Sequence, residues 1–153
     1  VDSLALEKIK AGFGPEPGQS AFNENFLVNL LASRSRNIKA LLLDQKQVAG
    51  LGNIYADEAL FLAGIRPDRP AGSLSLAEIK RLVKSAKELI KLAIKHRGTT
   101  FSDYRDASGR QGGFLTRLQV YGRRGQKCYR CGGIITKIKL AGRGTHFCPR
   151  CQK

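Results

Sequence analysis

All four cysteines of this chain lie in its last 27 residues, as two Cys-x-x-Cys pairs: Cys128 with Cys131, and Cys148 with Cys151. Thiolates spaced in this way on a tight turn can face one ion, and two such turns complete a tetrahedral shell. The 16 residues between the pairs suit a four-cysteine zinc site. Because four thiolates leave no open position for water or substrate, we expect one structural Zn²⁺.

Disulfide bonds are the competing explanation for these cysteines. The chain shows no secretory signal pattern and its cysteines lie in paired turns, which favours zinc. His146 precedes Cys148 by two residues, but a filled shell makes it a hairpin side chain rather than a ligand. The cysteine-containing segment is too short to build an adequate hydrophobic core. The metal would therefore supply most of its folding free energy.

Arg143 lies between Gly142 and Gly144 in this segment. Alternating residues 134–140 and a return strand at 145–147 predict a hairpin, with the turn at 141–144 and Arg143 at its tip. Another short strand is expected at 119–121. Glycines allow close approach of backbone to a duplex, and a guanidinium offers a phosphate two parallel hydrogen bonds. An arginine without a role in the turn is the alternative.

Charge favours the phosphate contact. Residues 1–94 contain 13 Lys and Arg against 10 Asp and Glu, a net of +3, whereas residues 95–153 contain 14 against 2, a net of +12; together these make the total of +15. The C-terminal third is therefore where a polyanion would bind. A basic surface that serves solubility is the alternative, and membrane binding is disfavoured because the cations follow no aromatic-edged amphipathic helix.

Four helical segments are expected before this basic third. One of roughly 10 residues begins at Phe22, a short second one has Ile38, Leu41 and Leu42 on one face with Lys39 off it, a third covers 54–63, and a fourth begins at the capping box of Ser75 and Glu78. The apolar stripe of the fourth ends near Gly98 and consists of Ile79, Leu82, Val83, Ala86, Leu89, Ile90, Ala93 and Ile94. Its opposite, solvated face carries Lys80, Lys84, Lys87, Lys91 and Lys95.

The third helix follows two glycines, Gly50 and Gly52, with Asn53 as the expected N-cap and Gly64 as its end. Glycines before a helix expose N–H groups, and the helix N-terminus adds partial positive charge, so a phosphate could bind there. A purely structural turn is the alternative reading.

Two stretches lack periodicity. Residues 12–19, with two prolines and three glycines, predict a loop after a short leading helix, and residues 99–114 form an irregular segment of a length that is usually functional or mobile. We therefore divide the chain into a leading linker (1–21), a helical domain (22–118) and a zinc hairpin (119–153). The absence of a signal pattern or a long apolar run makes a cytosolic or nucleoid location the default.

The motifs together closely resemble bacterial formamidopyrimidine-DNA glycosylase, of the formamidopyrimidine-DNA glycosylase/endonuclease VIII family, from about residue 12 to the end. The matching motifs are Gly14-Pro15-Glu16-Pro17, Leu51-Gly52-Asn53-Ile54-Tyr55-Ala56-Asp57-Glu58-Ala59-Leu60-Phe61, Gly64-Ile65-Arg66-Pro67, Gly98-Thr99-Thr100, Gln119-Val120-Tyr121-Gly122-Arg123 and Cys148-Pro149-Arg150-Cys151-Gln152-Lys153.

This resemblance implies a mainly α fold with a small β zinc ribbon: a helix-two-turns-helix DNA-binding domain followed by a four-cysteine zinc-finger hairpin. It implies that Asn53 binds a phosphate flanking the lesion, that Arg143 binds the phosphates of the damaged nucleotide, and that Tyr121 and Lys39 lie on the DNA-facing side. The predicted DNA-binding residues are therefore Asn53, Arg143, Tyr121, Lys39 and Gly52. Segment 99–114 matches the family's loop over the extruded base. The residues assigned to that loop are Thr99, Thr100, Arg110 and Phe114.

The resemblance also implies what these residues do not supply. In the family, an N-terminal Pro-Glu pair on a separate β-rich domain attacks the sugar and forms a Schiff base that leads to strand cleavage. This chain opens at Val1-Asp2 and contains no Met, so we expect a piece of a longer polypeptide with no catalytic residue of its own. Val1 has a primary amine with a pKa of about 8, but it is a poor substitute.

The resulting hypothesis is the DNA-binding portion of a base-excision-repair DNA glycosylase/AP lyase for oxidised purines (8-oxoguanine and formamidopyrimidines). Acting as a monomer, it would bind double-stranded DNA with an oxidised base or abasic site, without cleaving it. The related endonuclease VIII branch removes oxidised pyrimidines, and the length of segment 99–114 favours the formamidopyrimidine branch. A ribosomal or other RNA-binding zinc-ribbon protein and a protein-binding zinc ribbon are the alternatives.

Overall fold

The computed structural model describes residues 12–95 and 118–153. In chain order the elements are α2 (Glu24–Leu31), α3 (Ile38–Leu43), α4 (Asn53–Ala63), the 3-10 helix η1 (Ala71–Ser73), α5 (Leu76–Lys95), β1 (Thr136–Leu140) and β2 (Arg143–Phe147). The described part is mainly helical with one antiparallel hairpin, which confirms the expected fold class. The leading helix and segment 99–114 lie outside the described residues.

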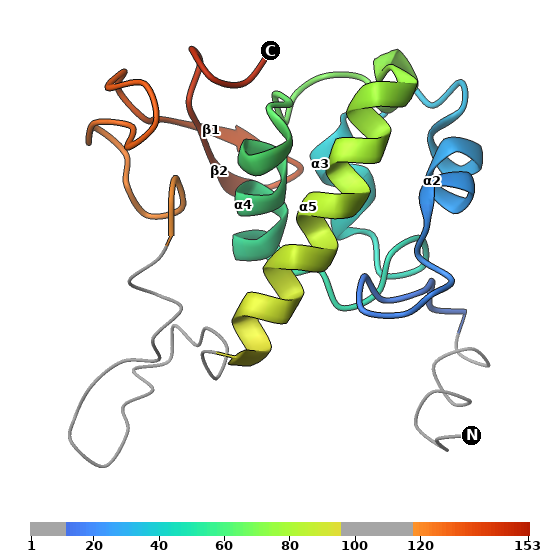
Figure 1. The fold of residues 1–153 in the computed structure, drawn as a ribbon. Coiled ribbons are helices and arrows are strands. Elements are labelled where there is room, and N and C mark those ends of the chain that lie inside the picture. The colour runs from blue at the N-terminus through green and yellow to red at the C-terminus, as the bar shows by residue number, and fades with distance from the viewer. Residues whose placement is uncertain (1–11, 96–117) are drawn as a thin grey trace.

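The central element is α4. The hairpin contacts α4 through β2, α4 packs against α5 and α3, and α5 packs against α2 (Figure 1). Because neighbours cover α4 on several sides, consecutive residues 56–61 are all buried, whereas a surface helix buries one stripe. The helical region and the hairpin therefore meet through α4.

Local capping explains where three of the helices begin. Side-chain oxygens of Asn23 and Asn37 accept backbone N–H groups at 2.9 and 2.7 Å and cap α2 and α3, as N-cap residues do. The capping box of α5 is confirmed: the Glu78 amide donates to the Ser75 hydroxyl at 3.2 Å, and the Ser75 amide donates to the Glu78 carboxylate at 2.8 Å. Because the cap is Asn23, α2 begins two residues after the predicted start at Phe22.

The ends of α4 differ in one respect from the prediction. Gly52 is the N-cap, with extended backbone and no side-chain cap bond, and Asn53 is the first helical residue. The Asn53 side chain is consequently not used for capping and turns toward the hairpin. Gly64 ends the helix in the left-handed region at a φ of 73°, as predicted, and glycine adopts this conformation without strain.

The two faces of α5 largely agree with the sequence pattern. The stripe is buried as far as Ala93 except for the half-buried Ile90, but the expectation for Ile94 is wrong, because this side chain is 76% exposed on a last turn that extends beyond α4 (Figure 1). On the opposite face the lysines are exposed except Lys87. Its ammonium donates to the carbonyls of Pro17 and Gln19 at 3.2 and 3.0 Å and so ties the 12–19 loop to α5.

The turn of the zinc hairpin is shorter than expected. Leu140 pairs with Arg143, so the turn is Ala141-Gly142, both with positive φ (51° and 74°), as in a two-residue type I′ turn. Arg143 is therefore the first residue of β2 rather than the tip of the turn. The alternation of β1 is confirmed from Thr136 onward.

Two further strand expectations are wrong. Ile134 is 52% exposed and precedes β1, whereas Ile135 is buried. Residues 119–121 form no strand, because their amides bind a carboxylate of α4 instead of a neighbouring strand.

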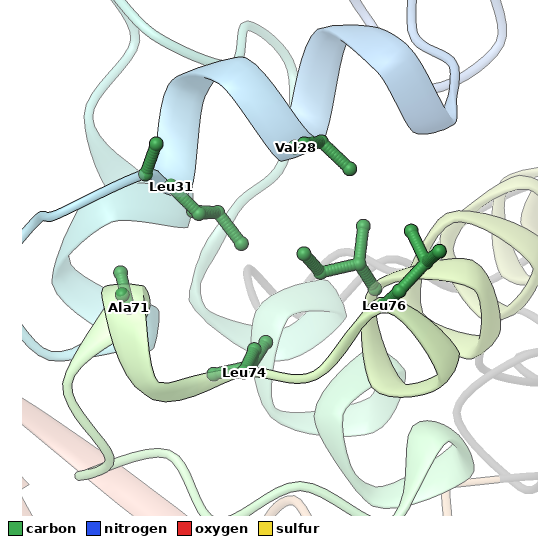
Figure 2. A pocket seen from close by; sticks show the side chains of 8 residues that line it. Val28, Leu31, Ala71, Leu74 and Leu76 are labelled. Carbon is green, nitrogen blue, oxygen red and sulfur yellow. The ribbon is translucent and has the colours of Figure 1, made fainter.

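Two apolar clusters stabilise the described part. The larger lies among the helices, and the smaller joins Phe61 of α4 to Val120, Ile135 and two zinc-site cysteines. A surface pocket of about 230 Å³ opens between α2, η1 and α5 (Figure 2). It is lined by Val28, Leu31, Ala32, Ala71, Gly72, Leu74, Leu76 and Ile79. These side chains offer no group for metal or phosphate chemistry.

Within residues 12–95 and 118–153, no helix combines the length and the apolar character that a bilayer span requires.

Candidate nucleic-acid interface and metal centre

The four cysteine Sγ atoms lie within 4.8 Å of one another. Cys128 and Cys151 are 3.8 Å apart, and Cys131 and Cys148 are 3.4 Å apart. Thiolates bound to a tetrahedral zinc at about 2.3 Å would lie roughly 3.8 Å from one another. None of the four forms a disulfide, so they are positioned to bind one metal ion, and an all-sulfur donor set suits structural Zn²⁺.

Backbone amides around the centre favour the thiolate form. The Gly133 amide donates to Cys131 Sγ at 3.4 Å and lowers the pKa of that thiol to about 7. Burial has the opposite effect on Cys148 and raises the pKa of its thiol. Since the metal binds thiolates, zinc loading releases protons and weakens in acid.

Two of the predicted DNA-binding residues, Asn53 and Tyr121, meet at the first turn of α4, next to the backbone that follows a third, Arg143. The Asn53 side-chain amide donates to the Gly144 carbonyl at 3.1 Å and to the Tyr121 hydroxyl at 3.5 Å. Gly144 directly follows Arg143, whose side chain is exposed. The Tyr121 ring packs edge-on against His146, with centroids 4.7 Å apart. The start of α4, Tyr121 and the backbone beside Arg143 therefore form one continuous surface.

Gly52 leaves space beside this surface. It is exposed, and no atom lies within 4 Å of the position that a Cβ would occupy there. A phosphate can therefore approach the first amides of α4, where the helix dipole favours an anion.

The prediction that Lys39 lies off the buried face of its helix is wrong, because its side chain has no exposed area. Its ammonium forms an ion pair with Asp57 at 2.7 Å and donates to the Thr145 hydroxyl at 2.7 Å and to the Gly144 carbonyl at 3.1 Å. Burial lowers the pKa of Lys39 and nearby Arg143 acts in the same direction, while Asp57 opposes both. A phosphate outside the protein cannot reach this ammonium in the described conformation.

Two adjacent carboxylates of α4, which sequence reasoning missed, hold the zinc segment. Asp57 accepts the His146 amide at 2.9 Å. Glu58 accepts the amides of residues 119, 120 and 121 at 2.6, 2.8 and 2.9 Å; burial raises its pKa and these donors oppose the shift. The sequence did contain a signal for these contacts: two adjacent acidic residues lie inside an otherwise apolar helix of a strongly basic chain. Because carboxylates are rarely buried without partners, such a pair indicates buried hydrogen-bond donors nearby.

Four other predicted residues, Thr99, Thr100, Arg110 and Phe114, lie outside the described residues. Their predicted role over an extruded base stays a prediction.

The fold and the site together define a mainly helical protein in which the start of α4 lies against a hairpin that carries a four-cysteine metal centre. The sequence matches the family description "Formamidopyrimidine-DNA glycosylase H2TH domain" over residues 13–105 and "Zinc finger found in FPG and IleRS" over residues 125–153. The chain belongs to the formamidopyrimidine-DNA glycosylase family, in agreement with the resemblance of its motifs.

Individual relatives agree with this assignment. The formamidopyrimidine-DNA glycosylases of Moorella thermoacetica and Syntrophomonas wolfei are 54% and 52% identical over 118 residues, 77% of this chain. The crystal structure of the MutM (Fpg) protein from Thermus thermophilus covers 93% of the chain at 49% identity, with a TM-score of 0.85. A complex of the Lactococcus lactis Fpg with DNA containing an abasic site covers 100% at 44% identity, with a TM-score of 0.88.

The matches cover part of each relative. The chain spans 43% and 44% of the two glycosylases and 54% and 56% of the two solved chains, or about half the length of the relatives that it matches.

Proposed function

We propose that this chain is the DNA-binding portion of a base-excision-repair DNA glycosylase/AP lyase that removes oxidised purines such as 8-oxoguanine and formamidopyrimidines. The observation that carries the proposal is the contact between Asn53 and Gly144 at 3.1 Å, which joins the start of α4 to the strand that begins at Arg143. One DNA backbone could then contact a helix N-terminus and an exposed guanidinium together. The Lactococcus lactis relative in complex with abasic-site DNA supports this choice of ligand.

The excess of positive charge in the C-terminal third supports the same ligand, because phosphate contacts dominate the affinity of proteins for DNA. The family assignment disfavours the ribosomal or RNA-binding alternative. We further propose that residues 22–118 and 119–153 are the two domains, that segment 99–114 covers the damaged base, and that the chain acts as a monomer in the bacterial cytoplasm.

The test is a paired assay on one duplex that contains an abasic or 8-oxoguanine site. A gel shift measures affinity, and borohydride reduction traps any Schiff base between protein and DNA. We expect binding without a trapped adduct from these 153 residues. An adduct that depends on the Val1 amine would refute the binding-without-cleavage part of the proposal.

Arg143→Ala is the variant that examines the surface itself. Loss of one charge-assisted phosphate contact should weaken binding roughly 10- to 100-fold. It should also reduce the slope of log affinity against log salt by the contribution of about one phosphate contact. Lys84→Ala is the charge-matched control, since Lys84 is exposed on α5. Equal losses of affinity in both variants would show that DNA binding depends on net charge and not on the surface at Arg143.

The other candidate functions give different results in the same assay. Preference for structured RNA over the abasic duplex would support the RNA-binding alternative. Weak binding that does not depend on salt would support a protein-binding zinc ribbon.

A further inference from the structure

Lys39 connects three structural elements through one buried ammonium. It extends from α3, pairs with Asp57 of α4, and donates to Thr145 and Gly144 of β2. The side chains of Lys39, Asp57 and Thr145 have at most 1% of their surface exposed. A buried charge is costly unless it is fully partnered, so this arrangement fixes β2 against the two helices with little freedom.

The contacts converge on the backbone around Arg143. The Gly144 carbonyl accepts from both Lys39 and Asn53, each at 3.1 Å, and a carbonyl oxygen has two lone pairs for this. The Thr145 hydroxyl accepts from Lys39 at 2.7 Å and donates to the carbonyl of Arg143 itself at 3.1 Å. The chain of hydrogen bonds from Lys39 thus ends on the peptide group of the exposed arginine.

The far side of the same strand is fixed by the partner of Lys39. Asp57 accepts the His146 amide at 2.9 Å, and its carboxylate lies 3.3 Å from Nδ1 of that ring. One buried lysine–aspartate pair therefore restrains four successive residues, 143–146.

We propose that Lys39 is a positioning residue for DNA binding: together with Asp57 and Thr145 it fixes the backbone of Arg143 beside Asn53, so that both reach one phosphate backbone. The inference rests on the proposed function. It assigns Lys39 an indirect role, in place of the DNA-binding role that the resemblance implied.

A double-mutant cycle tests this role in the zinc-loaded protein with abasic duplex DNA. Lys39→Met and Arg143→Ala are measured singly and together. Each single change should weaken binding about tenfold, and the double variant should bind within about twofold of Arg143→Ala, because residues that act through one contact are not additive. Multiplied effects, with a further drop in the salt slope, would overturn the proposal in favour of a direct phosphate contact.

Thr145→Val keeps the test decisive if Lys39→Met folds poorly, because it removes the hydroxyl at nearly constant shape and leaves the ion pair intact. It should weaken DNA binding about threefold or more and lose this effect in the Arg143→Ala background. The matched control is Thr136→Val on β1, whose hydroxyl contacts the Ile134 carbonyl at 3.5 Å. Equal effects of the two valine substitutions would overturn the proposal.

A measurement without DNA separates this inference from the proposed function. Hydrogen exchange of the His146 amide in the free, zinc-loaded protein should speed up in Lys39→Met and in Thr145→Val but not in Thr136→Val. If the two variants exchange faster but the parent protein does not bind DNA, the proposed function is refuted and the restraint on β2 is supported. Unchanged exchange, with DNA binding intact, would refute the restraint itself.

Discussion

Replacing Glu58 with glutamine should weaken the attachment of the zinc segment to the helices. The carboxylate is 2% exposed, and its Oε2 accepts the amides of Val120 and Tyr121 while its Oε1 accepts the amide of Gln119. The retained oxygen of Glu58→Gln can serve the first two amides. The new NH₂ group then faces the third backbone amide. Because both groups are hydrogen-bond donors, no hydrogen bond forms between them.

The magnitude follows from these contacts. One charge-assisted hydrogen bond is lost, worth about 1.5–3 kcal/mol, and the other two weaken to roughly half because the acceptor becomes neutral. Against this, the substitution removes a buried charge, whose burial raises the pKa of Glu58. We expect a net loss of about 2 kcal/mol in the free energy of unfolding, and at least twice that for Glu58→Ala, which leaves all three donors without an acceptor.

The assay is urea unfolding of the zinc-loaded protein, followed by helical circular dichroism and by zinc release. In Glu58→Gln the two transitions should separate, because the zinc segment loses its hold on α4 before the helices unfold. Glu88→Gln, at an exposed position of α5, is the matched control and should stay within about 0.5 kcal/mol of the parent. The reasoning is refuted if Glu58→Gln behaves like this control.

Three further predictions concern other parts of the molecule. Chelation of zinc should unfold the hairpin and abolish salt-dependent DNA binding, while the helical circular dichroism signal, to which α5 contributes, is retained. Re-addition of Zn²⁺ should restore binding. The Arg69 guanidinium lowers the pKa of Glu78 from its ordinary 4.5, so this carboxylate contributes stability that is present above pH 4.5 and is lost as the pH falls through its folded-state pKa. Glu78→Gln should therefore cost about 1–2 kcal/mol at neutral pH, and its deficit relative to the parent should shrink in acid unfolding experiments; a constant deficit would contradict this. Ala141→Asn should raise thermal stability by about 0.5–1 kcal/mol, because Asn-Gly suits a turn in which residue 141 has a φ of 51° better than Ala-Gly does.

Sequence reasoning succeeded where the signal is local. The capping box of α5, the glycine end of α4 and the cysteine spacing each depend on a few neighbouring residues, and all three agree with the structure. The position of Arg143 was missed by a small margin, because a turn of two residues and a turn of four give nearly the same sequence pattern. The cap of α4 was displaced by one residue for a related reason, since Asn53 suits an N-cap but its side chain bonds the hairpin instead.

The burial of charged side chains could not be predicted from the neighbouring residues in the sequence. Lys39 resembles a surface lysine on a short helix, and its partner Thr145 lies 106 residues later in the chain. Residues 119–121 have a strand-like composition, but their amides bind Glu58, about 60 residues earlier. In each case a tertiary partner decided the outcome, and no pattern within a helix or strand encodes it.

The contacts of Lys39 and Asp57 with distant residues of the hairpin also order the folding reaction. Closure of the zinc centre joins cysteines 17 residues apart, whereas docking of the hairpin joins residues 89 and 106 positions apart. Because short loops close at lower entropic cost than long ones, we expect metal capture to precede docking. Co²⁺ absorption should then rise faster during refolding than protection of the His146 amide develops, and equal rates would contradict this order. A nascent chain would in that case carry a metallated but undocked hairpin, and the surface containing Asn53 and Arg143 would be completed in the last step of folding.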